Sequence, residues 1–290
     1  MEKLREPVLL VGYRGMLGTE LLKILQEQSI QTVAVDLKEM DITSRDSVNC
    51  AFEEFHPAVV LNASGFTDVD GCESQVETAF AVNAEGPANL AAASAKTGAF
   101  LIHVSTDYVF DGTRREPYRE DDPLNPLGVY GKSKAAGEIR VREIIPENHC
   151  IVRTQWLFGL HGKNFVDTII RLSGERDVLT IVDDQIGSPT YAPDLAEALV
   201  TLARMRGRGT FHVTNSGITS WYGFAAKIVE MAGRSTVIEP MKSSELQRPA
   251  PRPLYSVLDN TRFLSLCGYA PREWTAALQA YLKERKDGIQ

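Results

Sequence analysis

The sequence predicts an α/β fold built on a parallel sheet with helices on both faces. Short, continuously apolar segments alternate with amphipathic segments of helical length along the first half of the chain. Such strands are buried on both faces, as are parallel strands joined by crossover helices. A glycine-rich turn at residues 12–18 (GYRGMLG) joins the first apolar segment to the first helix. Because crossovers of this kind are right-handed, the sheet should be doubly wound, as in the Rossmann fold.

The elements of the first half follow this alternation in order. Val8–Val11 is a short apolar strand, and the helix after the glycine turn has apolar residues at helical spacing. The second strand ends at Asp36. The further elements that we expect are a strand at 32–35, a helix at 44–55, a strand at 58–62, a helix at 77–96, a strand at 100–104, a helix that contains Tyr130 and a strand at 150–152.

The pattern is less regular after residue 152, which indicates a smaller second lobe of mixed α/β structure. Residues 248–253 (RPAPRP) should be extended, because proline disfavours helix. We predict a dinucleotide-binding Rossmann domain over residues 1–152 and a mainly substrate-binding lobe over residues 153–290, with some later elements returning to the first domain. The expected elements of the second half are helices at 165–172, 193–204, 221–231 and 274–284 and strands at 179–182 and 210–213.

Composition and charge exclude several functional classes. The net charge of −7 over 290 residues argues against a nucleic-acid-binding surface. No apolar run approaches the roughly 18 residues of a membrane span, and the first residues lack the apolar core of a signal peptide. The four cysteines lack metal-ligand spacing. We therefore expect a cytoplasmic protein with no membrane or nucleic-acid partner, no disulfide and no metal site.

The glycine turn is expected to hold a dinucleotide cofactor. Gly12, Gly15 and Gly18 permit a tight turn, close approach of the backbone to a pyrophosphate, and close packing of helix on strand. The N-terminus of the helix then directs its N–H groups at the phosphates. The motif is informative because it lies between a strand and a helix, which is the context that a dinucleotide site requires.

The residues around this turn favour two different cofactors. Asp36 ends the second strand, where an acidic side chain hydrogen-bonds the ribose of NAD and disfavours a 2′-phosphate. Arg14 favours NADPH, since a guanidinium in the turn can bind that phosphate. We therefore expect NADPH to serve and NADH to be used as well. Asp41 and Ile42 are expected at the adenine, with a helix cap and a core position as their alternative roles.

A tyrosine and a lysine are the candidate acid–base pair. Tyr130 and Lys134 are four residues apart in an expected helix, so they lie on the same face. The Lys134 ammonium should then lower the pKa of the Tyr130 phenol toward the working range. A hydroxyl from Ser105 or Thr106, after an apolar strand, can hold a carbonyl oxygen. Either feature alone is common, but together with the glycine turn they predict a hydride-transfer site.

Longer strings of residues indicate a family. Residues 105–112 (STDYVFDG), 153–156 (RTQW) and 184–190 (DQIGSPT) follow the glycine turn in that order. From about residue 8 to about residue 285 the chain resembles the extended short-chain dehydrogenase/reductases, and among these the dTDP-4-dehydrorhamnose reductases. The resemblance implies NAD(P)H-dependent reduction of the 4-keto group of dTDP-4-dehydro-β-L-rhamnose to dTDP-L-rhamnose, in nucleotide-sugar and polysaccharide biosynthesis.

The resemblance also implies roles for individual residues. Thr106 would polarise the carbonyl, Tyr130 would donate the proton, and Lys134 would bind the ribose and tune the phenol. The implied substrate-binding residues are Asp107, Tyr108, Trp156, Asn164, Gln185 and Arg252. The expected cofactor-binding residues are Gly12, Arg14, Gly15, Met16, Leu17, Gly18, Asp36, Asp41, Ile42, Asn62, Ala63, Ser64, Tyr130 and Lys134. Alternative roles are a core position for Trp156, a surface ion pair for Arg252 and a strand-end cap for residues 62–64.

Neighbouring families provide alternative functions. Sugar-nucleotide epimerase-reductases have a similar glycine turn, but their acid–base cysteine follows the catalytic hydroxyl, where this chain has Asp107 and Tyr108. Epimerisation is therefore disfavoured. A reductase of another nucleoside-diphosphate 4-keto-6-deoxysugar is one alternative. A non-catalytic subunit resembling the regulatory β subunit of methionine adenosyltransferase is another, although Thr106, Tyr130 and Lys134 are all present here. The assembly is left open, with a homodimer as the simplest case.

Overall fold

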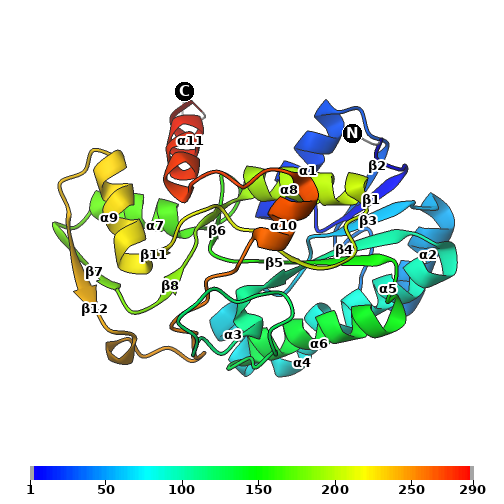
Figure 1. The fold of residues 1–290 in the computed structure, drawn as a ribbon, viewed down its shortest axis with the longest axis horizontal. Helices are drawn as coiled ribbons and strands as arrows, with labels where there is room; N and C mark the ends of the chain where they lie inside the picture. Colours follow the sequence, from blue (N-terminus) through cyan, green and yellow to red (C-terminus); the bar gives the residue numbers. More distant parts are fainter. Residues whose placement is uncertain (1–2, 288–290) are drawn as a thin grey trace.

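Six strands form the central sheet of the computed structural model, which describes residues 3–287 (Figure 1). They are β1 (Val8–Val11), β2 (Thr32–Val35), β3 (Val59–Asn62), β4 (Phe100–Thr106), β5 (His149–Thr154) and β10 (Gly209–His212). Their order is β10-β5-β4-β3-β1-β2, and all neighbours are parallel. The direction in which strands are added reverses at β1 and β3, and such a switch point leaves a crevice at the carboxyl ends of the strands.

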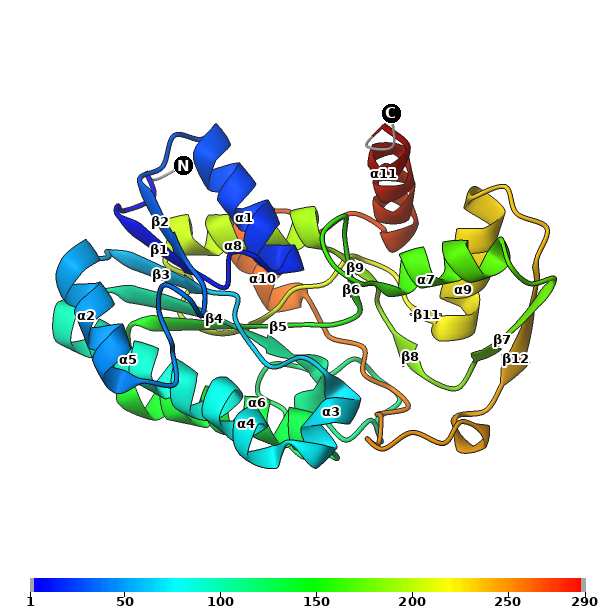
Figure 2. The ribbon, with the colours of Figure 1, turned by 180° about the vertical axis from the view of Figure 1, so that it is seen from behind.

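Helices cover both faces of this sheet (Figure 2). Leu10 of β1 packs into the core on one face and its neighbour Leu9 into the core on the other, because successive strand residues point to opposite sides. The helices on the first face are α1 (Met16–Glu27), α8 (Ala192–Met205) and α10 (Thr261–Cys267), and those on the second are α2 (Arg45–Phe55), α5 (Gly86–Thr97) and α6 (Val129–Ile144). The prediction of a doubly wound fold is confirmed.

The helix expected at 77–96 is divided in the structure. α4 (Val76–Phe80) and α5 are joined by a π-helical segment, η1 (Ala81–Glu85). Pro87 lies in the first turn of α5 and cannot donate the backbone hydrogen bond that one continuous α-helix would need there. Short π-helical segments often lie beside functional sites, and η1 lines the cleft described below.

A smaller lobe of mixed α/β structure lies beside the sheet. Aromatic side chains such as Phe158, Phe224 and Tyr281 fill its core. Its helices are α7 (Phe165–Ser173), α9 (Trp221–Met231) and α11 (Trp274–Asp287). Its strands pair two by two: β7 (Val178–Val182) with β12 (Val237–Met241), β8 (Ile186–Gly187) with β11 (Thr219–Ser220), and β6 (Leu157–Phe158) with β9 (Thr190–Tyr191).

Several short elements were absent from the sequence-based expectation. Strands β6, β8, β9 and β11 have two residues each, which is too short for any periodicity to show. The strand expected at 210–213 forms β10, which pairs with β5 at the edge of the main sheet. The remaining short elements are α3 (Val69–Ser74), η2 (Asp107–Val109) and η3 (Ser243–Glu245).

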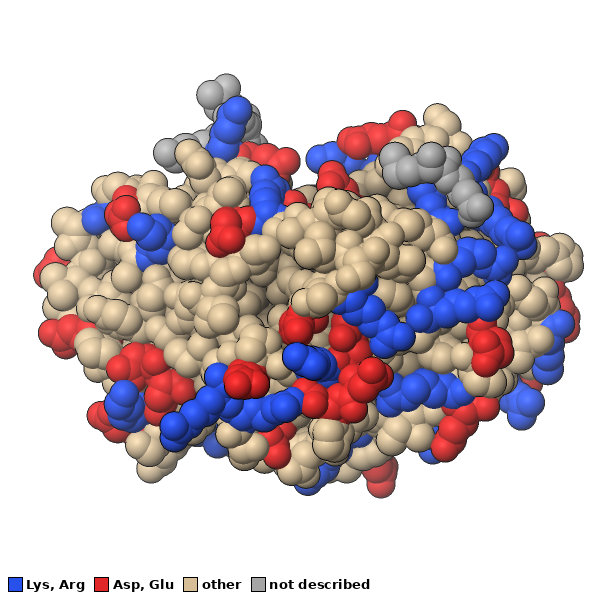
Figure 3. Space-filling model, viewed as in Figure 1, with Lys and Arg blue, Asp and Glu red and all other residues tan. Residues whose placement is uncertain are grey.

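The surface is mixed in charge. Acidic and basic side chains are interspersed over much of the face shown in Figure 3, as the modest net charge of −7 leads one to expect. Within residues 3–287, no helix combines the length and the apolar character that crossing a membrane would require.

Candidate active site

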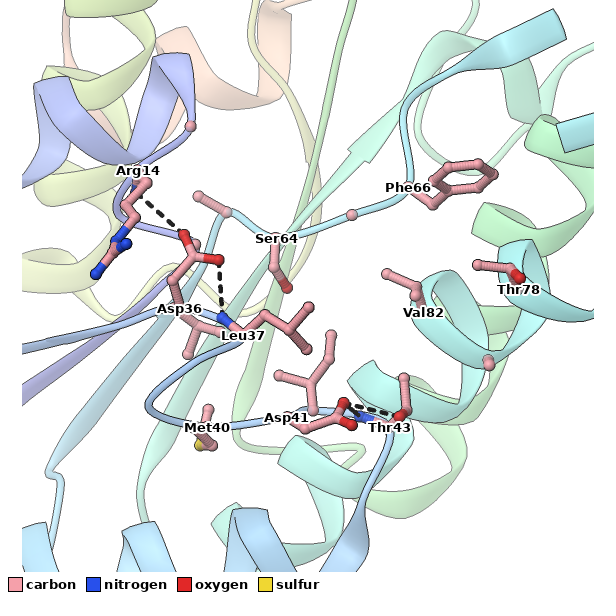
Figure 4. Close-up of a pocket in the computed structure, with 17 residues that line it drawn as sticks. Arg14, Asp36, Leu37, Met40, Asp41, Thr43, Ser64, Phe66, Thr78 and Val82 are labelled. Carbon is pink, nitrogen blue, oxygen red and sulfur yellow. Dashed lines mark hydrogen bonds between the residues drawn. The ribbon is translucent and has the colours of Figure 1, made fainter. Parts of the chain in front are cut away.

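Three adjoining clefts lie along the carboxyl ends of the central strands. The first, the glycine-turn cleft, has a volume of about 700 Å³ and is lined by the glycine turn and the ends of β2 and β3 (Figure 4). The second, the tyrosine cleft, has about 530 Å³ and contains the end of β4 and the start of α6. The third, the arginine cleft, has about 360 Å³ and is lined mainly by the second lobe. Ser64 lines the first two clefts and Tyr108 the last two, so the three are contiguous.

The glycine turn has the geometry of a phosphate cradle. Gly12 has a φ of 81°, and a Cβ atom there would come within 2.8 Å of the Ser64 backbone nitrogen. A Cβ atom on Gly18 would lie 2.0 Å from the Gly12 carbonyl oxygen. Helix α1 begins after Gly15 with neither a side-chain cap nor an acidic residue in its first turn. Its first N–H groups are therefore free for an anion such as the pyrophosphate of a dinucleotide.

Arg14 and Asp36 face each other at the rim of this cleft (Figure 4). The Asp36 carboxylate accepts hydrogen bonds from the Arg14 backbone nitrogen at 3.3 Å and the Leu37 backbone nitrogen at 2.8 Å. The Arg14 guanidinium instead donates to Glu39 at 2.9 Å. Sequence reasoning missed Glu39, whose only signal was its position three residues after Asp36. The Glu39 carboxylate therefore pairs with the guanidinium that was expected to bind the 2′-phosphate of NADPH.

Asp41 and Ile42 both line the glycine-turn cleft. The Asp41 carboxylate accepts hydrogen bonds from the Thr43 backbone nitrogen at 2.9 Å and the Thr43 hydroxyl at 2.7 Å. Ser44, and not Asp41, caps helix α2. Ile42 is only 7% exposed and packs in the core, so it is a core residue and a wall of the cleft at once.

Residues 62–64 divide between two tasks. Ala63 and Ser64 line the first two clefts. Asn62 is buried: its amide group donates to His103 Nδ1 at 3.0 Å, and its carbonyl oxygen accepts from the Ser64 backbone nitrogen at 3.1 Å. Asn62 is absent from the lining of the three clefts. It therefore orients Ser64 from behind the cleft wall.

The expected catalytic residues converge in the tyrosine cleft. Thr106 ends β4, and its hydroxyl donates to Asp107 Oδ1 at 2.9 Å. Tyr130 lies in the first turn of α6 and lines the same cleft as Thr106. The rings of Tyr108 and Tyr130 meet edge to face with centroids 5.4 Å apart. Lys134 lies one turn further along α6 and is 4% exposed.

Burial determines the protonation of these groups. It raises the pKa of the Tyr130 phenol, although the nearby Thr106 hydroxyl opposes this change. Burial lowers the pKa of Lys134 to about 8, and the Lys134 ammonium donates to the Val104 carbonyl oxygen at 2.6 Å. The expectation that Lys134 lowers the pKa of the phenol is therefore wrong for this arrangement. Tyr130 is therefore protonated at neutral pH, the form that the predicted proton donor requires. Burial also raises the pKa of Asp107 to about 6.

Trp156 forms part of the wall of the tyrosine cleft. Its φ is 48°, in the left-handed region that side chains rarely adopt. Its ring stacks on Trp221 with centroids 3.7 Å apart. A Cβ atom on Gly187 would lie 2.7 Å from the Trp156 indole, so glycine is required behind it. Trp221 was not expected at the site, because nothing in the sequence links it to Trp156.

The remaining expected substrate residues lie in different places. Gln185 and Arg252 line the arginine cleft. Both terminal nitrogens of Arg252 bind the Asp70 carboxylate of α3, at 3.1 and 2.9 Å, so this cation has a carboxylate partner. Asn164 is absent from the lining of the three clefts: its side chain caps α7 and donates to the Gly159 carbonyl oxygen at 2.9 Å. Its assignment to the substrate stays a prediction.

Comparison with known proteins identifies the family of this chain. Residues 6–286 match the family described as the RmlD substrate binding domain. The chain belongs to this family. The resemblance seen in the sequence is thereby confirmed.

Individual relatives support the same placement. The chain is 43% identical to the spore coat polysaccharide biosynthesis protein SpsK of Bacillus subtilis, covering 96% of this chain and 97% of that protein. It is 44% identical to the dTDP-4-dehydrorhamnose reductase of Streptomyces griseus, covering 93% and 91%. A crystal structure of dTDP-4-dehydrorhamnose reductase from Bacillus anthracis in complex with NADP is 38% identical, with a TM-score of 0.93 over 97% of this chain and 100% of that one.

Proposed function

We propose that this member of the family reduces the 4-keto group of dTDP-4-dehydro-β-L-rhamnose to the hydroxyl of dTDP-L-rhamnose with NADPH, and that NADH is used as well. The observation that carries the proposal is the convergence of Thr106, Tyr130 and Lys134 in one cleft that adjoins the glycine turn. The glycine cradle and the free N-terminus of α1 fit a dinucleotide. Relatives named as dTDP-4-dehydrorhamnose reductases, and one of known structure with NADP, support the substrate and the cofactor.

The chemistry combines a hydride and a proton. NADPH, when bound, supplies a hydride to the carbonyl carbon of the sugar. The Tyr130 phenol donates its proton to the carbonyl oxygen, so the C=O group becomes CH–OH and the phenol becomes a phenolate. The Thr106 hydroxyl, which donates to Asp107 in this structure, can turn its hydrogen bond to the same oxygen. The Lys134 ammonium, which donates to the Val104 carbonyl oxygen in this structure, would turn toward the phenolate and stabilise it until solvent returns the proton.

Aromatic and cationic side chains suit the rest of a deoxysugar nucleotide. The Trp156 ring offers an apolar face to the methyl group and C–H edges of the sugar. Tyr108 connects the tyrosine cleft to the arginine cleft, where Gln185 and Arg252 can meet the nucleotide-diphosphate end. Arg252 would have to share its guanidinium with Asp70 to do so.

A second substrate is supported by a particular relative. The chain is 37% identical to a dTDP-4-keto-6-deoxy-D-glucose reductase of Streptomyces niveus, covering 93% of this chain and 94% of that protein. Reduction of another dTDP-4-keto-6-deoxysugar therefore ranks second. The same residues would catalyse it, since only the stereochemistry around the carbonyl changes. A cytoplasmic location and a homodimer stay predictions.

The test is a panel of substrates with the purified protein. Oxidation of NADPH is followed with dTDP-, UDP- and GDP-linked 4-keto-6-deoxysugars, and the products are identified by NMR. We expect turnover with the dTDP-4-dehydrorhamnose substrate and a product with the L-rhamno configuration. Preferential turnover of another sugar favours the second candidate. Binding without any turnover, in a protein that retains NADPH, contradicts a catalytic function.

A further inference from the structure

A fully buried ion pair lies directly behind the tyrosine cleft. The side chains of Glu138 and Arg153 are 0% and 1% exposed. The guanidinium binds the carboxylate through two hydrogen bonds, Nε to Oε1 at 2.9 Å and a terminal nitrogen to Oε2 at 2.7 Å. Removing two charges from water is costly, so a buried ion pair contributes little net stability compared with apolar residues. The proposed reaction uses neither residue, which leaves the presence of the pair to be explained.

Glu138 is joined to both halves of the catalytic arrangement. It lies one helical turn after Lys134 on α6, so the two side chains share a face of the helix. Its Oε1 atom also accepts a hydrogen bond from the Ser105 hydroxyl at 2.6 Å. Ser105 immediately precedes Thr106 on β4. The Glu138 carboxylate thus contacts β4, the strand that ends at Thr106. It also lies on the same face of α6 as Lys134, the proposed partner of the Tyr130 phenolate.

The Arg153 guanidinium is held from its other side as well. Its remaining terminal nitrogen donates to the Glu120 carbonyl oxygen at 3.1 Å and meets His212 Nε2 at 3.2 Å. A terminal nitrogen of Arg142 on α6 donates to Glu138 Oε2 at 3.3 Å. These contacts leave Glu138 with little freedom to move. The carboxylate is therefore rigid as well as buried.

We propose that Glu138 is a positioning residue for the reduction, which holds the end of β4 through Ser105 and keeps Lys134 in its charged form. The inference rests on the proposed function. Burial favours the neutral form of Glu138, but the charge of Arg153 holds its pKa below the usual range, so it stays ionised. Burial lowers the pKa of Lys134, and the charge of Glu138 opposes that change. Two further titratable groups lie near Lys134, Tyr130 on the same face of α6 and His103 of β4, and burial keeps both neutral.

The test compares Glu138→Gln with Glu143→Gln, an exposed carboxylate on the same helix that loses the same charge. We expect the alkaline limb of the kcat profile to move to lower pH by about one unit in Glu138→Gln, because a nearby opposite charge shifts a pKa by roughly this amount or more. The Kd of NADPH, measured by fluorescence without any sugar, should rise over the same pH range. Glu143→Gln should change neither quantity.

Two further variants separate the effect of the Ser105 hydrogen bond from that of the Glu138 charge, and both from a failure to fold. Ser105→Ala removes the bond to β4 but retains the charge, so kcat should fall several-fold while the alkaline limb stays in place. Glu138→Gln with Arg153→Gln removes both buried charges, so no unpaired charge prevents folding if the single variant fails to fold. It should show the same shift in pH. If the wild type is active but the alkaline limb of the kcat profile does not move in the folded Glu138 variants, the inference is overturned. An inactive wild type contradicts the proposed function instead.

Discussion

The two ends of the cleft differ in how far apart along the chain their residues lie. The glycine-turn end comes from one turn and the ends of β2 and β3, the two strands that flank β1, and Gly12 and Gly18 enforce its shape by leaving no room for a Cβ atom. The sugar end is gathered from distant segments: Trp156 stacks on Trp221, and Arg252 pairs with Asp70 of α3. The first end is a property of local backbone. The second depends on how the smaller lobe packs on the sheet, so substrate preference can change there without disturbing the cofactor.

Tyr130→Phe should slow the chemical step and leave binding at both ends of the cleft unchanged. It has the largest expected effect. The variant loses the proton donor but retains the ring that packs on Tyr108. A loss of roughly 10²–10⁴ in kcat is expected for a missing general acid, while the Kd values of NADPH and of dTDP stay near those of the wild type. Steady-state kinetics and equilibrium titrations measure this. Near-normal turnover would show that another group donates the proton.

Asp107→Asn tests how much the buried Asp107 carboxylate lowers the free energy of unfolding. The pKa of Asp107 is raised from 3.8 to about 6, so the folded state binds this proton more tightly than the unfolded state and its ionisation destabilises the fold. At pH 8 the variant should therefore gain about 2–3 kcal/mol in the free energy of unfolding. The gain should fall below about 1 kcal/mol at pH 4, near the unfolded-state pKa of 3.8, and vanish below about pH 3, where the acid is protonated in both states. Urea denaturation at both pH values measures it.

A control variant makes this prediction specific. Asp177→Asn changes an exposed carboxylate and should leave stability nearly unchanged at either pH. An equal gain for Asp107→Asn at pH 4 and pH 8 would contradict the role of ionisation. Asp107→Asn should also bind the keto sugar less well than the wild type, since Asp107 lines the tyrosine cleft.

Trp156→Ala should affect the sugar end alone. Loss of the stacked indole is expected to raise KM for the keto sugar about tenfold, the equivalent of one aromatic contact, and to leave the Kd of NADPH unchanged. Trp221→Ala should do the same to a smaller extent, because Trp221 contacts Trp156 and not the reacting atoms. Melting temperatures are measured beside the kinetic constants. A large drop in melting temperature with an unchanged KM would make Trp156 a core residue instead.

Glu39→Gln and Arg14→Ala should affect the cofactor end alone, in opposite directions. Glu39 occupies the Arg14 guanidinium, so removing its charge frees that group for a 2′-phosphate. We expect the ratio of kcat/KM for NADPH to that for NADH to rise about two- to fivefold in Glu39→Gln, the range of an exposed ion pair. Arg14→Ala should lower the same ratio. Equal changes for both cofactors would remove Arg14 from the 2′-phosphate site.

The strands and helices of the first half could be predicted because each is long enough to show its pattern. β1 is an unbroken apolar run, β3 is apolar as far as Asn62, and α2 shows helical periodicity after its Ser44 cap. The break at η1 escaped detection, since the apolar spacing continues through it. The two-residue strands of the smaller lobe carry no pattern at all. Periodicity therefore predicts elements well only above a certain length.

For the candidate site, the sequence indicated the residues but not their partners. Thr106, Tyr130 and Lys134 were expected from spacing and resemblance, and the fold brings them into one cleft. Glu138 was missed, because its importance arises from Ser105 and Arg153, which approach it from two different strands. No spacing rule reveals such a contact.

The sequence by itself determined the doubly wound sheet, the glycine cradle and the placing of Tyr130 and Lys134 on one helix face, because each depends on residues a few positions apart whose backbone geometry is local. Only the tertiary structure decided which charges face each other. The pKa of Tyr130 was expected to fall beside Lys134, yet burial raises it and Lys134 donates to Val104. Solvent exclusion and long-range contacts set these energies, and both arise only when the sheet, α6 and the smaller lobe have packed together.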